Sequence, residues 1–197
     1  MISKLALITA KWFIKDNDTI YKEVETYEYA FFIIYSSIFY LIITLIFGGI
    51  LKIFIESIIF FIAFLPIRIY AGGYHASTET RCEIISTLSI AASIGIIKIS
   101  RLYDFYTIVL TIALISASII LLLSPLDTPE KSLTDDEKKY YRKISLVVLL
   151  VITTVIIVSY CFKLYTLCIP GCVSLIAEGA FLFLGKIKSS IYKKHNN

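Results

Sequence analysis

A histidine and a cysteine, His75 and Cys82, lie in a polar segment between two apolar runs of the chain. A cysteine becomes a nucleophile when a base within hydrogen-bond reach takes the proton of its thiol. On one continuous helix the two residues would stand about 10.5 Å apart along the axis, so a working pair requires the chain to turn between them. Gly72 and Gly73 favour such a turn, which predicts His75 in a loop. The alternative is a solvated histidine and a cysteine that packs as a small core residue.

The residues around Cys82 predict a helix that begins just before it. Thr80 and Glu83 have the spacing of a capping box, which would make Thr80 the N-cap and Cys82 the second helical residue. The positive end of the helix dipole, the unpaired N–H groups there and the neighbouring Arg81 would all favour a thiolate at Cys82. A helix that starts one turn earlier, at Ser77, would favour it less.

Other polar residues of the segment are candidates for supporting roles. Backbone N–H groups at Gly72 and Gly73 can approach a substrate carbonyl, as an oxyanion hole requires. Arg68 is predicted either to hold a substrate carboxylate or the loop's own carbonyls, or to be a basic anchor at the membrane surface. No third catalytic residue is evident, and the candidates are Glu79, Glu83 and Ser86.

The composition is that of an integral membrane protein. Of the 197 residues, 58% are hydrophobic and 17% are charged, against about 25% charged in soluble domains. Long apolar runs that predict spans are 29–51, 105–126, 144–162 and 164–185. Two shorter runs, 53–67 and 84–97, flank the polar segment. We therefore predict an all-α, polytopic single domain over 1–197 with about six transmembrane helices, or four if the short pair is re-entrant.

The distribution of basic residues predicts the orientation. With six spans, one side holds both termini, the 68–82 segment as a catalytic loop and the 127–143 loop. That side collects all the Lys and Arg residues except Lys52, Lys98, Arg101 and Lys163. Because basic residues favour the inner face, we expect the termini and the active site to be cytoplasmic in a multi-pass plasma-membrane protein.

Two further segments carry local signals. Residues 1–28 are predicted to be an amphipathic, interfacial region, because apolar and lysine side chains within 1–15 fall on different helical faces. The alternative is an N-terminal helix packed in the core. Thr134 and Glu137 have the spacing of a capping box, which predicts that a helix starts in the 127–143 loop.

The remaining chemistry is limited. The net charge of +4 is small, which argues against nucleic acid as a partner, whereas the lipid bilayer is an expected one. Cys168 and Cys172 have no histidine or third thiol near them in sequence, so we expect no metal and no cofactor. Glu56 is expected to pair with Lys52 four residues before it. Glu178 is expected either to pair with a basic residue of the catalytic segment or to reach water.

These residues resemble the accessory gene regulator B (AgrB) membrane peptidases of Gram-positive quorum sensing. The matching pattern is Arg68, Ala71-Gly72-Gly73, His75-Ala76 and Cys82. A second match is "SPLDTPEKSLTDDEKKYYRKIS", residues 124–145, where Ser132 replaces the proline of many members. Length, span pattern and motif order agree over nearly the whole chain.

The resemblance implies a cysteine endopeptidase that cleaves the C-terminal part of an AgrD-like autoinducer precursor. It implies that His75 and Cys82 are catalytic and that Arg68 and Gly73 are essential. The thioester formed at Cys82 would pass to a Cys or Ser of the precursor and give a thiolactone or lactone. The family also implies a precursor leader on the membrane and a homodimer. The alternatives are a peptide exporter without proteolytic activity, with a pathway marked by Glu56, Glu178 and a kink at Pro170, and a structural scaffold.

Overall fold

The computed structural model describes residues 2–14, 21–74, 76, 78–127 and 133–195. The secondary-structure elements within these residues are all α-helices. They are α1 (Ile2–Ile14), α2 (Tyr21–Ile50), α3 (Phe54–Ala71), α4 (Glu79–Leu102), α5 (Tyr106–Leu123), α6 (Asp135–Cys161) and α7 (Tyr165–His195). Each helix from α2 to α7 is long and apolar enough to cross a membrane. The prediction of an all-α, polytopic fold with six spans is confirmed, and the short apolar runs belong to helices of 18 and 24 residues.

The chain divides into two compact units, Met1–Ile43 and Thr44–Asn197. In the first unit α1 packs along α2, where Phe13 contacts Phe31 edge to face and the hydroxyls of Thr9 and Tyr35 lie 3.0 Å apart. The large apolar side chains of α1 that stay exposed include Leu5, Ile8 and Trp12. Exposed apolar side chains on a basic helix are what an interfacial helix requires.

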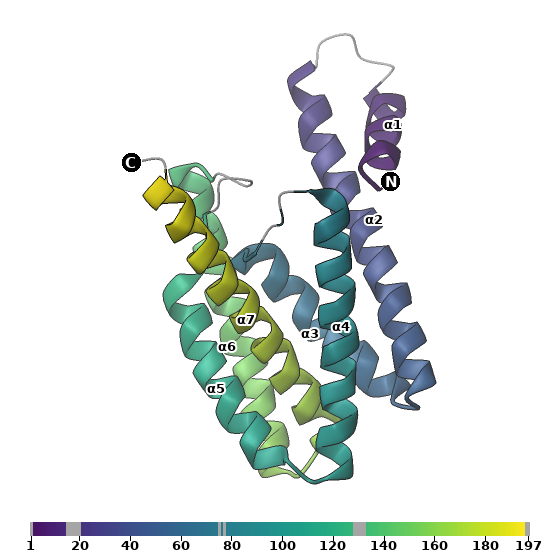
Figure 1. Cartoon of the computed structure of the whole chain (residues 1–197), viewed down its shortest axis with the longest axis vertical. Helices are drawn as coiled ribbons and strands as arrows, with labels where there is room; N and C mark the ends of the chain where they lie inside the picture. The colour runs from purple at the N-terminus through teal and green to yellow at the C-terminus, as the bar shows by residue number, and fades with distance from the viewer. Residues whose placement is uncertain (1, 15–20, 75, 77, 128–132, 196–197) are drawn as a thin grey trace. The chain divides into compact units, whose positions relative to one another are not determined.

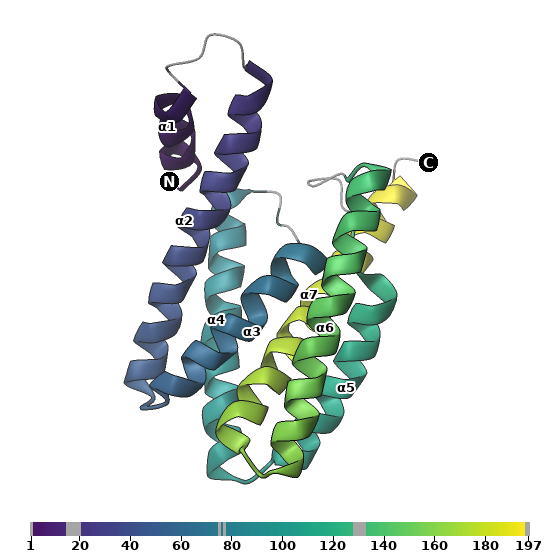
Figure 2. The ribbon, with the colours of Figure 1, turned by 180° about the vertical axis from the view of Figure 1, so that it is seen from behind.

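In the second unit, α7 is the central helix. It contacts α3, α4, α5 and α6, and Figures 1 and 2 show it from two sides with these helices around it. In its span 72% of the residues are buried, against 39% in the span of α3 and 22% in each of the spans of α4, α5 and α6. The helix that ends the chain therefore forms the core against which the other spans pack.

Glycines on α7 allow this close packing. A methyl group at Gly179 would come within 2.8 Å of the Ser116 Cβ on α5, and one at Gly171 within 2.9 Å of Ile156 on α6. Small residues at helix contacts let backbones approach closely, which is a main source of packing energy between membrane helices.

An ion pair joins the beginning of α3 to the end of α4. Arg101 donates to the carboxylate of Glu56, whose side chain is 6% exposed. The predicted pairing of Glu56 with Lys52 is therefore wrong. Lys52 has a positive φ of 56° in the turn before α3, so the two residues do not share the helix that an i,i+4 pair needs.

The predicted capping box at the start of α6 is present. The N–H of Glu137 donates to Thr134 Oγ1 over 3.3 Å, and the N–H of Thr134 donates to Glu137 Oε2 over 2.8 Å. These two bonds satisfy N–H groups that a helix start would otherwise leave unpaired.

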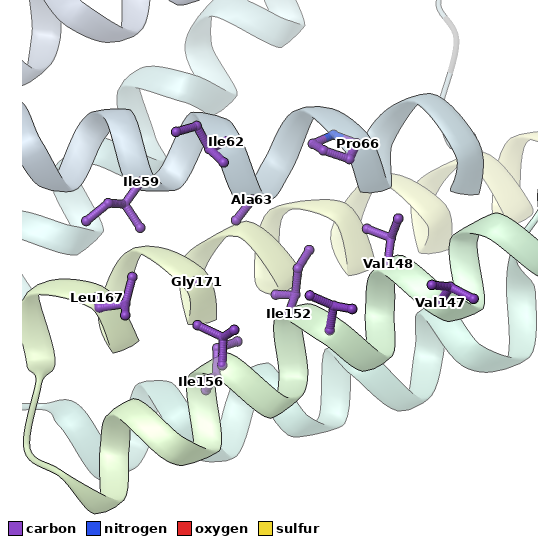
Figure 3. A pocket seen from close by; sticks show the side chains of 12 residues that line it. Ile59, Ile62, Ala63, Pro66, Val147, Val148, Ile152, Ile156, Leu167 and Gly171 are labelled. Carbon is purple, nitrogen blue, oxygen red and sulfur yellow. The ribbon is translucent and has the colours of Figure 1, made fainter.

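An apolar groove of about 490 Å³ lies between α3, α6 and α7 (Figure 3). Its lining consists of Ile59, Ile62, Ala63, Pro66, Val147, Val148, Val151, Ile152, Val155, Ile156, Leu167 and Gly171. Because these side chains are apolar throughout, the groove offers no group for acid–base or nucleophilic chemistry.

The glycine packing gives a first prediction. Gly179→Ala should destabilise the protein by about 1–3 kcal/mol, because the added methyl overpacks the contact with Ser116. Thermal unfolding in detergent micelles measures the effect. The matched control is Gly95→Ala in α4, where a Cβ would meet nothing within 4 Å, so stability should be unchanged or slightly raised. Equal unfolding temperatures for the two variants would contradict the packing argument.

Candidate active site

The chain leaves α3 through two glycines with left-handed backbone angles. Gly72 has φ 79° and Gly73 has φ 135°, values that residues with a Cβ rarely adopt. After them, Tyr74, Ala76 and Thr78 lie outside any helix. The predicted interruption between α3 and α4 is therefore present, and Gly72 and Gly73 produce it.

Arg68, in the last turn of α3, fastens this turn. Its Nη1 donates to the carbonyl oxygen of Gly72 over 2.8 Å, and its Nη2 donates to that of Tyr74 over 2.9 Å. The guanidinium also lies 4.3 Å from the ring centre of Phe181 on α7. Hydrogen bonds from a charged donor contribute about 1.5–3 kcal/mol each. Arg68 thus holds the loop's own carbonyls, as one of its alternatives predicted; the role of holding a substrate carboxylate stays a prediction.

The same loop is fastened to α7 through its backbone. The N–H of Tyr74 donates to the carbonyl oxygen of Phe181 over 3.0 Å. A methyl at Gly185 would come within 2.9 Å of both Gly73 C and Tyr74 N, so the absence of a side chain there makes room for the loop. A methyl at Gly73 would collide with the Arg68 guanidinium. At both Gly73 and Gly185, therefore, the packing leaves no space for a side chain.

The segment after α5 closes the other side of the turn. The N–H of Leu126 donates to the carbonyl oxygen of Ala71 over 2.9 Å. Ser124 in turn contacts α6, because its hydroxyl lies 2.6 Å from that of Ser145 and its carbonyl accepts from Arg142. The two stretches of the chain with sequence signals, 68–82 and 124–145, therefore meet in space.

Cys82 lies in the first turn of α4, but two positions later in it than predicted. The N-cap is Thr78, with φ −137° and ψ 147°, and its hydroxyl accepts from the N–H of Arg81. The predicted cap at Thr80 is therefore wrong, and Ser77, the alternative helix start, lies outside the described residues. Thr78 takes the role because the chain is still extended there, as an N-cap requires. Cys82 is the fourth helical residue, and its N–H already donates to the carbonyl oxygen of Thr78 over 3.1 Å.

The other candidate residues divide into two groups. The first group is half-buried on the first two turns of α4 and consists of Cys82, Glu83 and Ser86. His75 lies outside the described residues, as does the side chain of Glu79, so the geometry of the predicted dyad and of that candidate is not described. Among the described residues, no three His, Cys, Asp or Glu side chains gather as a metal site would require.

The family model of accessory gene regulator B matches residues 6–182. The chain belongs to the accessory gene regulator B (AgrB) family. No curated protein and no solved structure matches the chain. The AgrB assignment supports a role in processing the autoinducing peptides of quorum sensing, on an AgrD-type precursor at a membrane.

A buried carboxyl group of α7 lies close to Arg68, the residue that holds the loop after α3. Glu178 is fully buried, and its Oε2 lies 3.8 Å from Nη1 of Arg68. The prediction that Glu178 pairs with a basic residue of the catalytic segment is confirmed, and the alternative that it reaches water is wrong.

The sequence did not predict which residues of this AgrB-family chain would contact the loop after α3. Phe181, Gly185 and Leu126 contact it, yet nothing in their own neighbourhoods in sequence points to residues 68–74. Gly185 was the one available signal, because a glycine near the end of an apolar helix often marks a close backbone approach.

The loop contact gives a second prediction. Gly185→Ala should lower the processing of an AgrD-type precursor on the order of tenfold, because the methyl displaces the backbone of Gly73 and Tyr74. Precursor and product are measured by mass spectrometry at equal membrane abundance, with Gly95→Ala as the control. Processing at the parent rate would show that this contact does not position the loop.

Proposed function

We propose that this AgrB-family chain is a membrane-embedded cysteine endopeptidase that cleaves the C-terminal part of an AgrD-like precursor and promotes its cyclisation. The observation that carries the proposal is the fastened glycine turn between α3 and α4. It removes the main obstacle to a His75–Cys82 dyad, because α3 ends at Ala71 and α4 begins at Glu79, so that no single helix runs through the described residues of this segment.

In the first step the imidazole of His75 takes the thiol proton of Cys82, and the sulfur attacks a carbonyl carbon of the precursor. The C–N bond then breaks, the leaving amine takes the proton from His75, and an acyl thioester remains on Cys82. Gly72 and Gly73 are the proposed residues that bind the substrate carbonyl. The N–H of Tyr74 is not available for this, because it donates to Phe181.

In the second step a thiol or hydroxyl of the precursor gives its proton to His75 and attacks the thioester carbonyl. The Cys82 sulfur leaves and takes the proton back, and the ring closes as a thiolactone or a lactone. Exchange of one thioester for another costs little free energy, provided that water does not compete, and a site at the membrane edge serves to exclude it.

The exporter alternative depends on Glu56 and Glu178 as markers of a pathway. Each of these carboxylates pairs with an arginine of the same chain, Glu56 with Arg101 and Glu178 with Arg68. Internal pairing accounts for both acidic residues, so no observation favours the exporter. A homodimer, and a cytoplasmic position for the site and both termini, complete the proposal.

The dyad is tested with the cognate precursor and the protein in membranes. Cys82→Ala and His75→Ala should both abolish cleavage, because the nucleophile or its base is lost, and Cys82→Ala should also abolish the thioester. Electrophoresis without reducing agent detects the acyl-enzyme, and mass spectrometry detects the released fragment. Cys161→Ala, which changes an exposed cysteine at the end of α6, should cleave normally. Cleavage that survives Cys82→Ala would rule out the dyad.

The orientation is tested with single-cysteine variants that retain either Cys82 or Cys161. The proposed topology puts Cys82 at the inner end of α4 and Cys161 at the outer end of α6. A membrane-impermeant maleimide should therefore label Cys161 on intact cells and Cys82 in inside-out vesicles. The reverse pattern would overturn the topology.

A further inference from the structure

Glu178 is an ionisable residue in a place where a membrane protein rarely keeps one. Its side chain is fully buried in α7, and neither carboxylate oxygen has a hydrogen-bond partner among the residues that the structure describes. Burial of a carboxylate without donors is costly, and ionisable groups inside a span are usually retained for function. The charged group that faces it is Arg68, with Nη1 3.8 Å from Oε2.

The distance between these two groups shows how they interact. At 3.8 Å the carboxylate is beyond hydrogen-bond reach of Nη1, whereas the carbonyls of Gly72 and Tyr74 lie 2.8 and 2.9 Å from the guanidinium. Glu178 therefore lies beside the Arg68 guanidinium without taking the N–H groups that hold the loop. A carboxylate at direct hydrogen-bond distance would compete with those carbonyls.

Glu178 also lies on the part of α7 that receives the loop. Phe181 follows it by three residues and Gly185 by seven, which places all three on one face of the helix. Phe181 accepts the N–H of Tyr74 and packs its ring on Arg68, and Gly185 leaves space for the loop backbone. This face of α7 thus places four features beside the loop and Arg68: the Glu178 carboxyl group, the Phe181 ring, the Phe181 carbonyl as a hydrogen-bond acceptor, and the space left by Gly185.

We propose that Glu178 is a positioning residue for peptide cleavage. The ionised form of its carboxyl group attracts the Arg68 guanidinium and holds it where it fixes the carbonyls of Gly72 and Tyr74, and through them the chain that leads to Cys82. The inference rests on the proposed function and deepens it, because it assigns a role in cleavage to a residue outside the catalytic segment.

The chain contains a matched control for this role. Glu56 is also a buried carboxylate of a span, and it also pairs with an arginine, Arg101. Arg101 lies nineteen residues after Cys82 on the same helix, α4, which separates them by about 28 Å along the axis. Glu56→Gln therefore removes the same kind of charge at the far end of α4 from the proposed nucleophile.

The experiment measures kcat and KM for cleavage of the cognate precursor by the full chain in lipid nanodiscs. The variants are Glu178→Gln, Glu178→Asp, Arg68→Gln, the Glu178→Gln/Arg68→Gln double variant and Glu56→Gln. Glu178→Gln should lower kcat on the order of 10- to 100-fold with KM changed by no more than about twofold, because it misplaces the reacting groups rather than removing a substrate contact. Glu56→Gln should keep kcat within about threefold, and Glu178→Asp, which keeps the charge, should retain more activity than Glu178→Gln.

The double variant separates positioning through Arg68 from a general effect on stability. If Glu178 acts through Arg68, the double variant should cleave within about threefold of Arg68→Gln alone, because the second change has nothing further to remove. Losses that multiply would overturn the proposal, as would a Glu178→Gln variant with wild-type kcat or a Glu178→Asp variant no better than Glu178→Gln. If Glu178→Gln does not accumulate, the comparison of Glu178→Asp and of the double variant, in which Arg68 is also replaced, with Arg68→Gln decides the question. Cleavage that is absent in the wild type, or that survives Cys82→Ala, would instead overturn the proposed function.

Discussion

The contact between Arg68 and two loop carbonyls is the interaction on which the arrangement of the site depends. A chain that leaves a helix through two glycines has many conformations open to it, and freezing them costs conformational entropy. One guanidinium offsets that cost by bonding to carbonyls on both sides of Gly73. On α7 the carboxyl group of Glu178 and the ring of Phe181 both lie against this arginine.

The last helix therefore has two functions that are usually separate. Its glycines let α5 and α6 pack closely, as the contact of Gly179 with Ser116 shows, which makes α7 the core of the second unit. The same helix also receives the loop at Phe181 and Gly185. Because Leu126 joins the turn from the other side, three stretches far apart in sequence fix one loop.

Much of this fold follows from local sequence, and the site follows only in part. The six spans are predictable because each needs a long apolar run, and Thr134 is a reliable cap because Glu137 completes the box. The cap of α4 was misplaced because Thr78 and Thr80 are rival candidates, and the extended backbone after the glycines decides between them. The partner of Glu56 was missed because Lys52 lies in the turn before α3 and not in that helix. The role of Phe181 arises from tertiary packing, which no local pattern encodes.

The loop is held almost entirely through main-chain atoms: the carbonyls of Ala71, Gly72 and Tyr74 and the amides of Tyr74 and Leu126. Every amino acid except proline supplies such atoms at position 74, so the hydrogen bonds that hold the backbone do not depend on which side chain stands there. A different side chain at position 74 can thus change the surface that a neighbouring peptide contacts without removing the main-chain hydrogen bonds that hold the loop.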